Sequence, residues 1–188
     1  MKSEAERCKE AEIFRKIDAA FRNGDLAALR AAVEDPECVP NGPMPLAIGP
    51  CLEYAIYHSP LSFIRNLLEI GADPNPTDHA GFTPLIAALS CSRSHPGSPA
   101  RSDTLDIITL LLKFGADPNQ RGINDYTPLH MAVAERHPRA IEALLAAGAD
   151  PRLRTRIDDC ETPLEMAERA GFTEIAERLA AYESPPNR

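Results

Sequence analysis

The chain has 188 residues and a formal net charge of −8 at pH 7. This charge argues against a nucleic-acid partner, because phosphate binding needs a dense basic surface. The sequence has no apolar run of about 18 residues, the length that a membrane-spanning helix needs, so no membrane association is expected. Five cysteines are scattered without a Cys-x-x-Cys pair, and the charged N-terminus lacks the apolar run of a secretory signal. These features predict a cytoplasmic protein with reduced thiols.

The N-terminal part of the chain predicts a charged extension followed by a helix. Residues 1–10 are mostly charged, whereas Ile13, Phe14, Ile17 and Phe21 recur at helical spacing. We expect these four side chains to close the first part of the core.

Two tripeptides recur farther along the chain and alternate with each other. Gly-Ala-Asp begins at Gly71, Gly115 and Gly148, and Thr-Pro-Leu begins at Thr83, Thr127 and Thr162. Each Gly-Ala-Asp follows a leucine-rich stretch with helical spacing. One supersecondary unit has therefore been copied along the chain, and such a repeat determines the fold class before any other feature does.

The segment from Thr127 to Gly148 shows one unit without insertion. Thr127 is expected to cap a first helix, and Pro128 suits the first helical position because it has no N–H to leave unpaired. Gly148 supplies the left-handed conformation that ends a second helix. The apolar residues of both helices follow the i, i+3, i+4 pattern, at Leu129, Ala132 and Val133 and then at Ile141, Leu144 and Leu145.

These residues, together with the 33-residue spacing from Gly115 to Gly148, strongly resemble the ankyrin repeat. A small residue recurs in the same register, where neighbouring helices approach closely, at Ala55, Ala88, Ala132 and Ala167. The resemblance implies an all-α ankyrin-repeat solenoid of about five helix–turn–helix units joined by β-hairpin-like loops.

The register predicts a single repeat domain at residues 11–182, between the N-terminal extension and a tail at 183–188. Its approximate repeats are 11–42, 43–76, 77–120, 121–153 and 154–182. The third repeat carries an inserted loop at residues 90–103, rich in Ser, Pro, Gly and Arg. Such an insertion is either tolerated or used in binding, and the sequence leaves both interpretations open.

A second departure from the period is a charged segment before Thr162. Arg152, Arg154 and Arg156 alternate along it, and Asp158, Asp159 and Glu161 follow directly. The mixture of charges favours a solvated loop tip with local ion pairs over an anion-binding site. Acid–base catalysis by the acidic run is not expected, because nothing apolar surrounds it to raise a pKa.

The remaining chemistry-bearing residues do not form a catalytic motif. His130 follows Thr-Pro-Leu, where the resemblance implies a structural histidine that bonds the threonine. The other histidines have no i, i+4 partner and no nearby cysteine, so a metal site is not expected. Nucleophile-elbow, phosphate-loop and His-Glu-x-x-His motifs are all missing. We therefore expect no catalytic residue, no metal and no cofactor.

The resemblance implies that a protein or peptide partner binds the concave side, formed by the loop tips and the outward positions of the first helices. Phe82, Ile123 and Tyr126 matter most, because exposed apolar residues are favoured interface anchors. The alternative is that Phe82 and Tyr126 pack along their own loops. The transferred positions are Tyr57, His58, His79, Ala80, Phe82, Ser90, Ile123, Asn124, Tyr126, Glu135, Asp158, Asp159, Glu161 and Arg169.

The expected function is that of a non-catalytic protein–protein interaction module that is monomeric when alone. An alternative is an inhibitor or immunity-type regulator whose acidic surface covers a basic site on a single enzyme or toxin. A role as an enzyme or enzyme subunit has less support, because a fold alone never assigns an active site.

Overall fold

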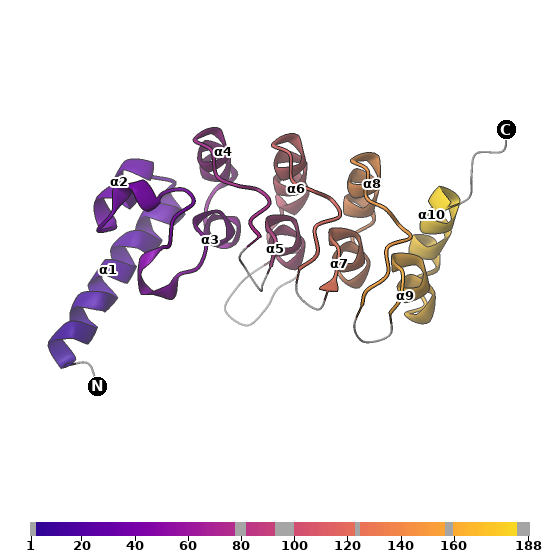
Figure 1. Ribbon diagram of the computed structural model, residues 1–188, viewed down its shortest axis with the longest axis horizontal. Coiled ribbons are helices and arrows are strands. Elements are labelled where there is room, and N and C mark those ends of the chain that lie inside the picture. The colour runs from indigo at the N-terminus through magenta and orange to yellow at the C-terminus, as the bar shows by residue number, and fades with distance from the viewer. Residues whose placement is uncertain (1–2, 78–81, 93–99, 123–124, 157–159, 184–188) are drawn as a thin grey trace. The chain divides into compact units, whose positions relative to one another are not determined.

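The protein is all-α, as the sequence predicts. The computed structural model describes residues 3–77, 82–92, 100–122, 125–156 and 160–183. These residues contain ten α-helices and no β-strand, and most of the helices form pairs joined by short turns (Figure 1). The chain divides into two compact units, Met1–Asp73 and Pro74–Arg188. The repeat boundaries given above stay a prediction.

The first unit begins with a long helix, α1, which covers 20 residues. A capping box between Ser3 and Glu6 starts it, and Gly24 ends it in the left-handed conformation, with φ of 67°. The N-terminal half of α1 extends past α2 (Figure 1). The helices of this unit are α1 (Glu4–Asn23), α2 (Leu26–Ala32), η1 (Pro36–Cys38), η2 (Pro45–Ala47), α3 (Cys51–His58) and α4 (Leu61–Glu69).

Only part of the predicted N-terminal core is buried. Ile17 and Phe21 are fully buried, and the Phe21 ring lies edge-on to Phe63 with centroids 5.8 Å apart. Ile13 is half-buried, however, and Phe14 is 42% exposed, so the expectation for these two residues was wrong. The physical reason is that the core begins at Ile17, one helical turn later, and the preceding turns of α1 have too little neighbouring structure to cover them.

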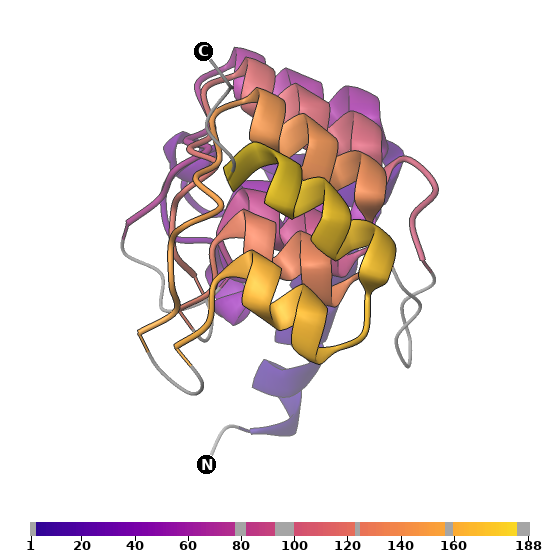
Figure 2. The same cartoon turned by 90° about the vertical axis from the view of Figure 1, so that its right-hand side faces the viewer.

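The second unit consists of three helical pairs. The first helix of each pair begins with proline behind a threonine whose side chain accepts a hydrogen bond from the third helical N–H, as the sequence predicts. The first helices α5, α7 and α9 pack side by side, and α6 packs on α8 (Figures 1 and 2). The helices are α5 (Pro84–Ser90), α6 (Thr104–Lys113), α7 (Pro128–Ala134), α8 (Pro138–Ala146), α9 (Pro163–Arg169) and α10 (Thr173–Glu183).

The inserted segment of the third predicted repeat has a closed base. The Arg101 N–H donates to the Cys91 carbonyl at 2.9 Å, and the Arg101 guanidinium pairs with Asp103 at 2.7 Å. Thr104 donates its hydroxyl to the Arg101 carbonyl at 3.0 Å and so fixes the start of α6. The helices on either side of the insertion, α5 and α6, therefore still pack against each other. The insertion can be accommodated without disturbing this helical pair.

An asparagine connects the two helical pairs of the first unit through the backbone. The Asn41 amide donates to the Gly71 carbonyl at 2.8 Å, and its oxygen accepts from the Asp73 N–H at 2.8 Å. We call this pair of bonds an asparagine bridge. It joins the loop behind the first helical pair to the Gly-Ala-Asp sequence that ends the second pair.

The second unit repeats this bridge twice and then stops. Asn75 bonds Gly115 at 2.8 Å and Asp117 at 2.6 Å, and Asn119 bonds Gly148 at 3.1 Å and Asp150 at 2.8 Å. Arg152 occupies the next corresponding position and pairs with Asp150 in its own loop, at 3.0 Å. Within each unit a bridge therefore connects one helical pair to the Gly-Ala-Asp of the next pair, through Asn41 in the first unit and Asn119 in the second.

Leu144 provides a direct test of the core. It is fully buried on α8, so Leu144→Ala should lower the free energy of unfolding by about 2–5 kcal/mol through lost transfer energy and a residual cavity. Leu112→Ala, at a half-buried position on α6, is the matched control and should cost clearly less. Urea titration measures both. Equal costs for the two variants would contradict the register of the helices.

The asparagine bridge is tested by comparing two corresponding positions. Asn119→Ala should lower the free energy of unfolding by about 1–3 kcal/mol, because the part-buried bond to the Asp150 N–H and the exposed bond to the Gly148 carbonyl are both lost. Arg152→Ala removes only an exposed ion pair and should change stability by less than about 1 kcal/mol. Thermal and urea unfolding check both values. A larger loss for Arg152→Ala than for Asn119→Ala would show that the bridge is not what holds successive pairs in register.

Candidate binding surface

The predicted anchors Phe82 and Tyr126 each lie directly before a capping threonine, and both are half-buried. The Tyr126 ring lies 5.6 Å from the His130 ring, with 31° between their planes. The Tyr126 carbonyl accepts from the Gly122 N–H at 2.9 Å. Tyr126 is therefore supported by its own loop and by α7, while part of its side chain remains accessible to solvent.

His130 connects the support of Tyr126 to the next helical pair. It is fully buried, and its Nδ1 accepts the Thr127 N–H at 3.3 Å and lies 2.8 Å from the Thr127 hydroxyl. Because Nδ1 accepts, Nε2 carries the proton and donates to the Glu161 carbonyl at 3.0 Å. Burial lowers the pKa of His130, so the ring is neutral near pH 7 and acts as a connector.

The loop before α7 is fixed by charged contacts that also reach the next loop. Asp125 has a left-handed backbone, with φ of 58°, and its side chain is 11% exposed. Its carboxylate accepts from Arg121 at 2.7 Å and from the Arg156 guanidinium at 2.6 Å. The hydrogen bonds from Arg156, followed by the neighbouring positive charges, hold the pKa of Asp125 below its usual value.

All three arginines of the charged segment are engaged in ion pairs. Arg152 pairs with Asp150 at 3.0 Å, Arg154 with Glu165 at 2.6 Å and Arg156 with Asp125 at 2.6 Å. This geometry supports the interpretation as local ion pairs and leaves little reason to assign an anion site here.

Several of the other predicted partner-binding residues in the second unit form hydrogen bonds or ion pairs with neighbouring residues. Glu161 and Arg169 form an ion pair with each other at 2.6 Å. Glu135, at the end of α7, accepts from the Ser92 hydroxyl behind α5 at 3.2 Å, and Ser90 donates to the Ala87 carbonyl at 2.8 Å. Because α5, α7 and α9 pack side by side, Ser90, Glu135 and Arg169 follow one another at the C-terminal ends of these helices.

The remaining transferred positions fall into two groups. Tyr57 and His58 lie on α3 in the first unit, with ring centroids 6.2 Å apart, and belong to a different compact unit from the positions above. Six positions lie outside the described residues, namely His79, Ala80, Ile123, Asn124, Asp158 and Asp159.

Sequence reasoning missed a polar cluster beside the aromatic residues of α3. The Tyr54 hydroxyl donates to Asp18 at 2.8 Å, and Arg22 pairs with the other oxygen of the same carboxylate at 2.8 Å. Burial, followed by the bond to Asp18, raises the pKa of Tyr54 to about 12. Its ring lies 4.4 Å from that of His58. No sequence motif indicates this cluster, because Asp18 and Arg22 lie on α1 whereas Tyr54 lies on α3, in the next helical pair.

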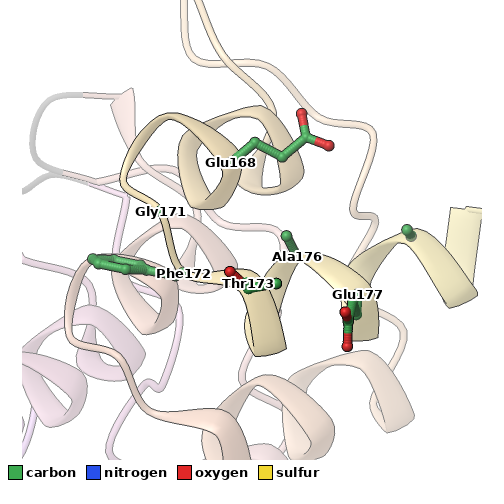
Figure 3. A pocket seen from close by; sticks show the side chains of 7 residues that line it. Glu168, Gly171, Phe172, Thr173, Ala176 and Glu177 are labelled. Carbon is green, nitrogen blue, oxygen red and sulfur yellow. The ribbon is translucent and has the colours of Figure 1, made fainter.

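Two pockets lined by described residues do not bring catalytic groups together. A shallow pocket of about 350 Å³ lies at the turn between α9 and α10, lined by Phe172, Thr173 and Ala176 among others. Figure 3 shows its two carboxylates, Glu168 and Glu177, pointing in different directions. Another pocket, of about 370 Å³, lies between α1 and α2 and is lined mainly by alanines.

The described residues give little support for a reactive cysteine, a metal site or a membrane-spanning helix. Burial raises the pKa of the Cys51 thiol to about 12 and that of Cys91 to about 11, which disfavours the reactive thiolate. In the described part of the chain, no group of His, Cys, Asp and Glu side chains could hold a metal ion. Among the same residues, no helix is both long and apolar enough to cross a membrane.

A comparison with protein families matches residues 98–188 to ankyrin repeats in three copies. A comparison with curated proteins found no match. The helical pairs, their Thr-Pro-Leu caps and the family match identify the chain as an ankyrin-repeat protein. Ankyrin repeats are generally protein–protein interaction modules and are typically non-catalytic.

The neutral state of His130 predicts how stability depends on pH. Burial lowers its pKa in the folded protein, so the unfolded chain, with a histidine pKa of about 6.5, binds more protons at mildly acidic pH. This contribution to stability is complete above about pH 6.5 and is lost as the pH falls below that value. Urea titrations from neutral to mildly acidic pH should show a steeper decline for the wild type than for His130→Gln, which has no imidazole at this position. Parallel declines would show that His130 does not titrate differently in the two states.

Proposed function

We propose that this ankyrin-repeat protein is a non-catalytic interaction module that binds a protein or peptide on the loop tips and first-helix ends of its second unit. The observation that carries the proposal is the support of Tyr126. Its loop is closed by the Gly122 bond, its ring lies on His130, and the neighbouring Asp125 is held by two arginines. An aromatic side chain held in this way loses little conformational entropy on binding.

The surface around Tyr126 is suited to recognition more than to chemistry. Its charged groups are largely paired with one another, as in Arg154–Glu165 and Glu161–Arg169, so they can form a polar rim around an aromatic anchor. Phe82 stands at the same place in the preceding helical pair and provides a second candidate anchor. The proposed surface also includes the predicted loop residues of the second unit that lie outside the described residues.

The acidic character of the chain favours a second candidate function, which is also a protein-binding function. A net charge of −8 promotes association with a basic protein through long-range attraction. The protein would then act as an inhibitor or immunity-type regulator that covers a basic site of one enzyme or toxin. A single dominant partner in affinity capture supports this candidate, and several unrelated partners support a general adaptor.

The proposed surface is tested by removing its two anchors. The double variant Phe82→Ala, Tyr126→Ala should weaken binding of a partner captured by the wild type by about 2 kcal/mol or more, because truncated aromatic anchors carry much of an interface's energy. Tyr182→Ala, which removes a tyrosine that is 56% exposed on α10, is the matched control and should bind normally. Isothermal titration calorimetry measures both affinities.

Circular dichroism and unfolding experiments should show that the double variant remains folded. If the double variant binds as tightly as the wild type, the assignment of the partner to this surface is wrong. The same conclusion follows if Tyr182→Ala alone abolishes binding.

A further inference from the structure

The last helical pair of the chain is attached differently from those before it. Asparagine bridges occur in both units before it, and each consists of two hydrogen bonds between a neutral side chain and the backbone. At the next position, as far as the described residues show, Arg152 bonds within its own loop, to Asp150. The α9–α10 pair therefore has no asparagine bridge from the loop behind α8.

Arginines provide polar contacts to α9–α10 on the loop side. Arg156, in the loop before α9, donates to Asp125 in the loop before α7 through its backbone N–H at 2.5 Å and its Nη2 at 2.6 Å. Arg121 donates to Asp125 at 2.7 Å and also to the Arg154 carbonyl at 2.8 Å. Two consecutive loops are thus connected through one carboxylate and two guanidinium groups.

Arginines also connect the two pairs at the opposite turn and between the second helices. The Arg136 guanidinium lies over the Phe172 ring, 4.0 Å from its centroid, a cation–π contact between the α7–α8 turn and the α9–α10 turn. Arg178 on α10 pairs with Glu142 on α8. We refer to the contacts of Arg121, Arg136, Arg156 and Arg178 as the arginine contacts.

The arginine contacts respond to salt in a way that asparagine bridges do not. Arg156 is 72% exposed, and the Arg178–Glu142 pair is 40% and 53% exposed, so dissolved ions screen these charges. The asparagine bridges carry no net charge. The buried side chains Ala167 and Leu179 and the His130 bond to Glu161 hold α9–α10 in place without charge, and the arginine contacts add to them.

We propose that α9–α10 is a separately releasable repeat, whose attachment to α7–α8 is strengthened by the arginine contacts and which opens more readily when those charges are screened. Opening of this repeat uncovers the face of α7–α8 that it covers, while the pairs joined by asparagine bridges stay closed. Repeats that contact only their neighbours open in this stepwise manner when one interface is weaker than the others. Because Glu161 and Arg169 lie on this repeat, a partner that binds them also holds it closed.

Hydrogen exchange of the full chain, followed by mass spectrometry of its peptides, tests the proposal. Raising sodium chloride from about 0.1 M to about 1 M shortens the Debye length from about 10 Å to about 3 Å. Amides of α9–α10 should then exchange about tenfold faster, as expected when several exposed ion pairs are screened. Amides of α7–α8 should change by less than about twofold, because their bridge to the preceding pair is uncharged.

Two variants separate the arginine contacts from general effects of salt. Asp125→Asn should speed exchange of α9–α10 at low salt and reduce its further response to salt. The matched control Asp150→Asn removes an ion pair of the same kind that stays within one loop and should leave α9–α10 as in the wild type. Equal acceleration of all helical pairs by salt overturns the proposal. Normal exchange of α9–α10 in Asp125→Asn overturns it as well.

Discussion

The asparagine bridge is the interaction on which the stacking of the helical pairs depends. The second helices α4, α6 and α8 each end in a Gly-Ala-Asp sequence whose carbonyl and N–H groups need hydrogen-bond partners. An asparagine amide provides one donor and one acceptor and satisfies both groups together. Because Asn41 and Asn119 each come from the loop behind the preceding pair of their own unit, their bonds form only when the successive pairs within that unit are in register. The positions of the loops and of the first helices follow from that register.

The candidate binding surface is a consequence of this stacking within the second unit. The threonine caps set where each first helix begins, so the residues before them recur at equivalent places. His130 uses its two ring nitrogens for the two tasks of closing its own cap and reaching the next loop. The Tyr126 ring lies 5.6 Å from this ring, and a half-buried aromatic side chain is thereby supported by a buried histidine. Recognition on such a surface requires no perturbed nucleophile and no metal.

The neutral asparagine bridges and the charged arginine contacts differ in their sensitivity to salt. Hydrogen bonds between amides and backbone are insensitive to ionic strength, whereas exposed guanidinium–carboxylate pairs are weakened by it. Asp125, which is nearly buried between two arginines, connects two loops that belong to different helical pairs. The surface proposed for binding and the proposed attachment of the last pair therefore share residues, so the two proposals together predict that a partner bound at this surface affects that attachment.

The sequence by itself determined the helical pairs, their caps and their buried apolar positions, because these depend on spacing within about 20 residues that recurs in each copy. It also indicated which residues precede the caps. The tertiary structure alone decided which charges pair, since Asp125 meets Arg156 and Arg121 meets Arg154 from separate copies. It likewise decided that Phe14 is exposed while Ile17 is buried. Helical periodicity specifies which face of a helix is apolar, but how far along its length that face is covered depends on the neighbouring elements.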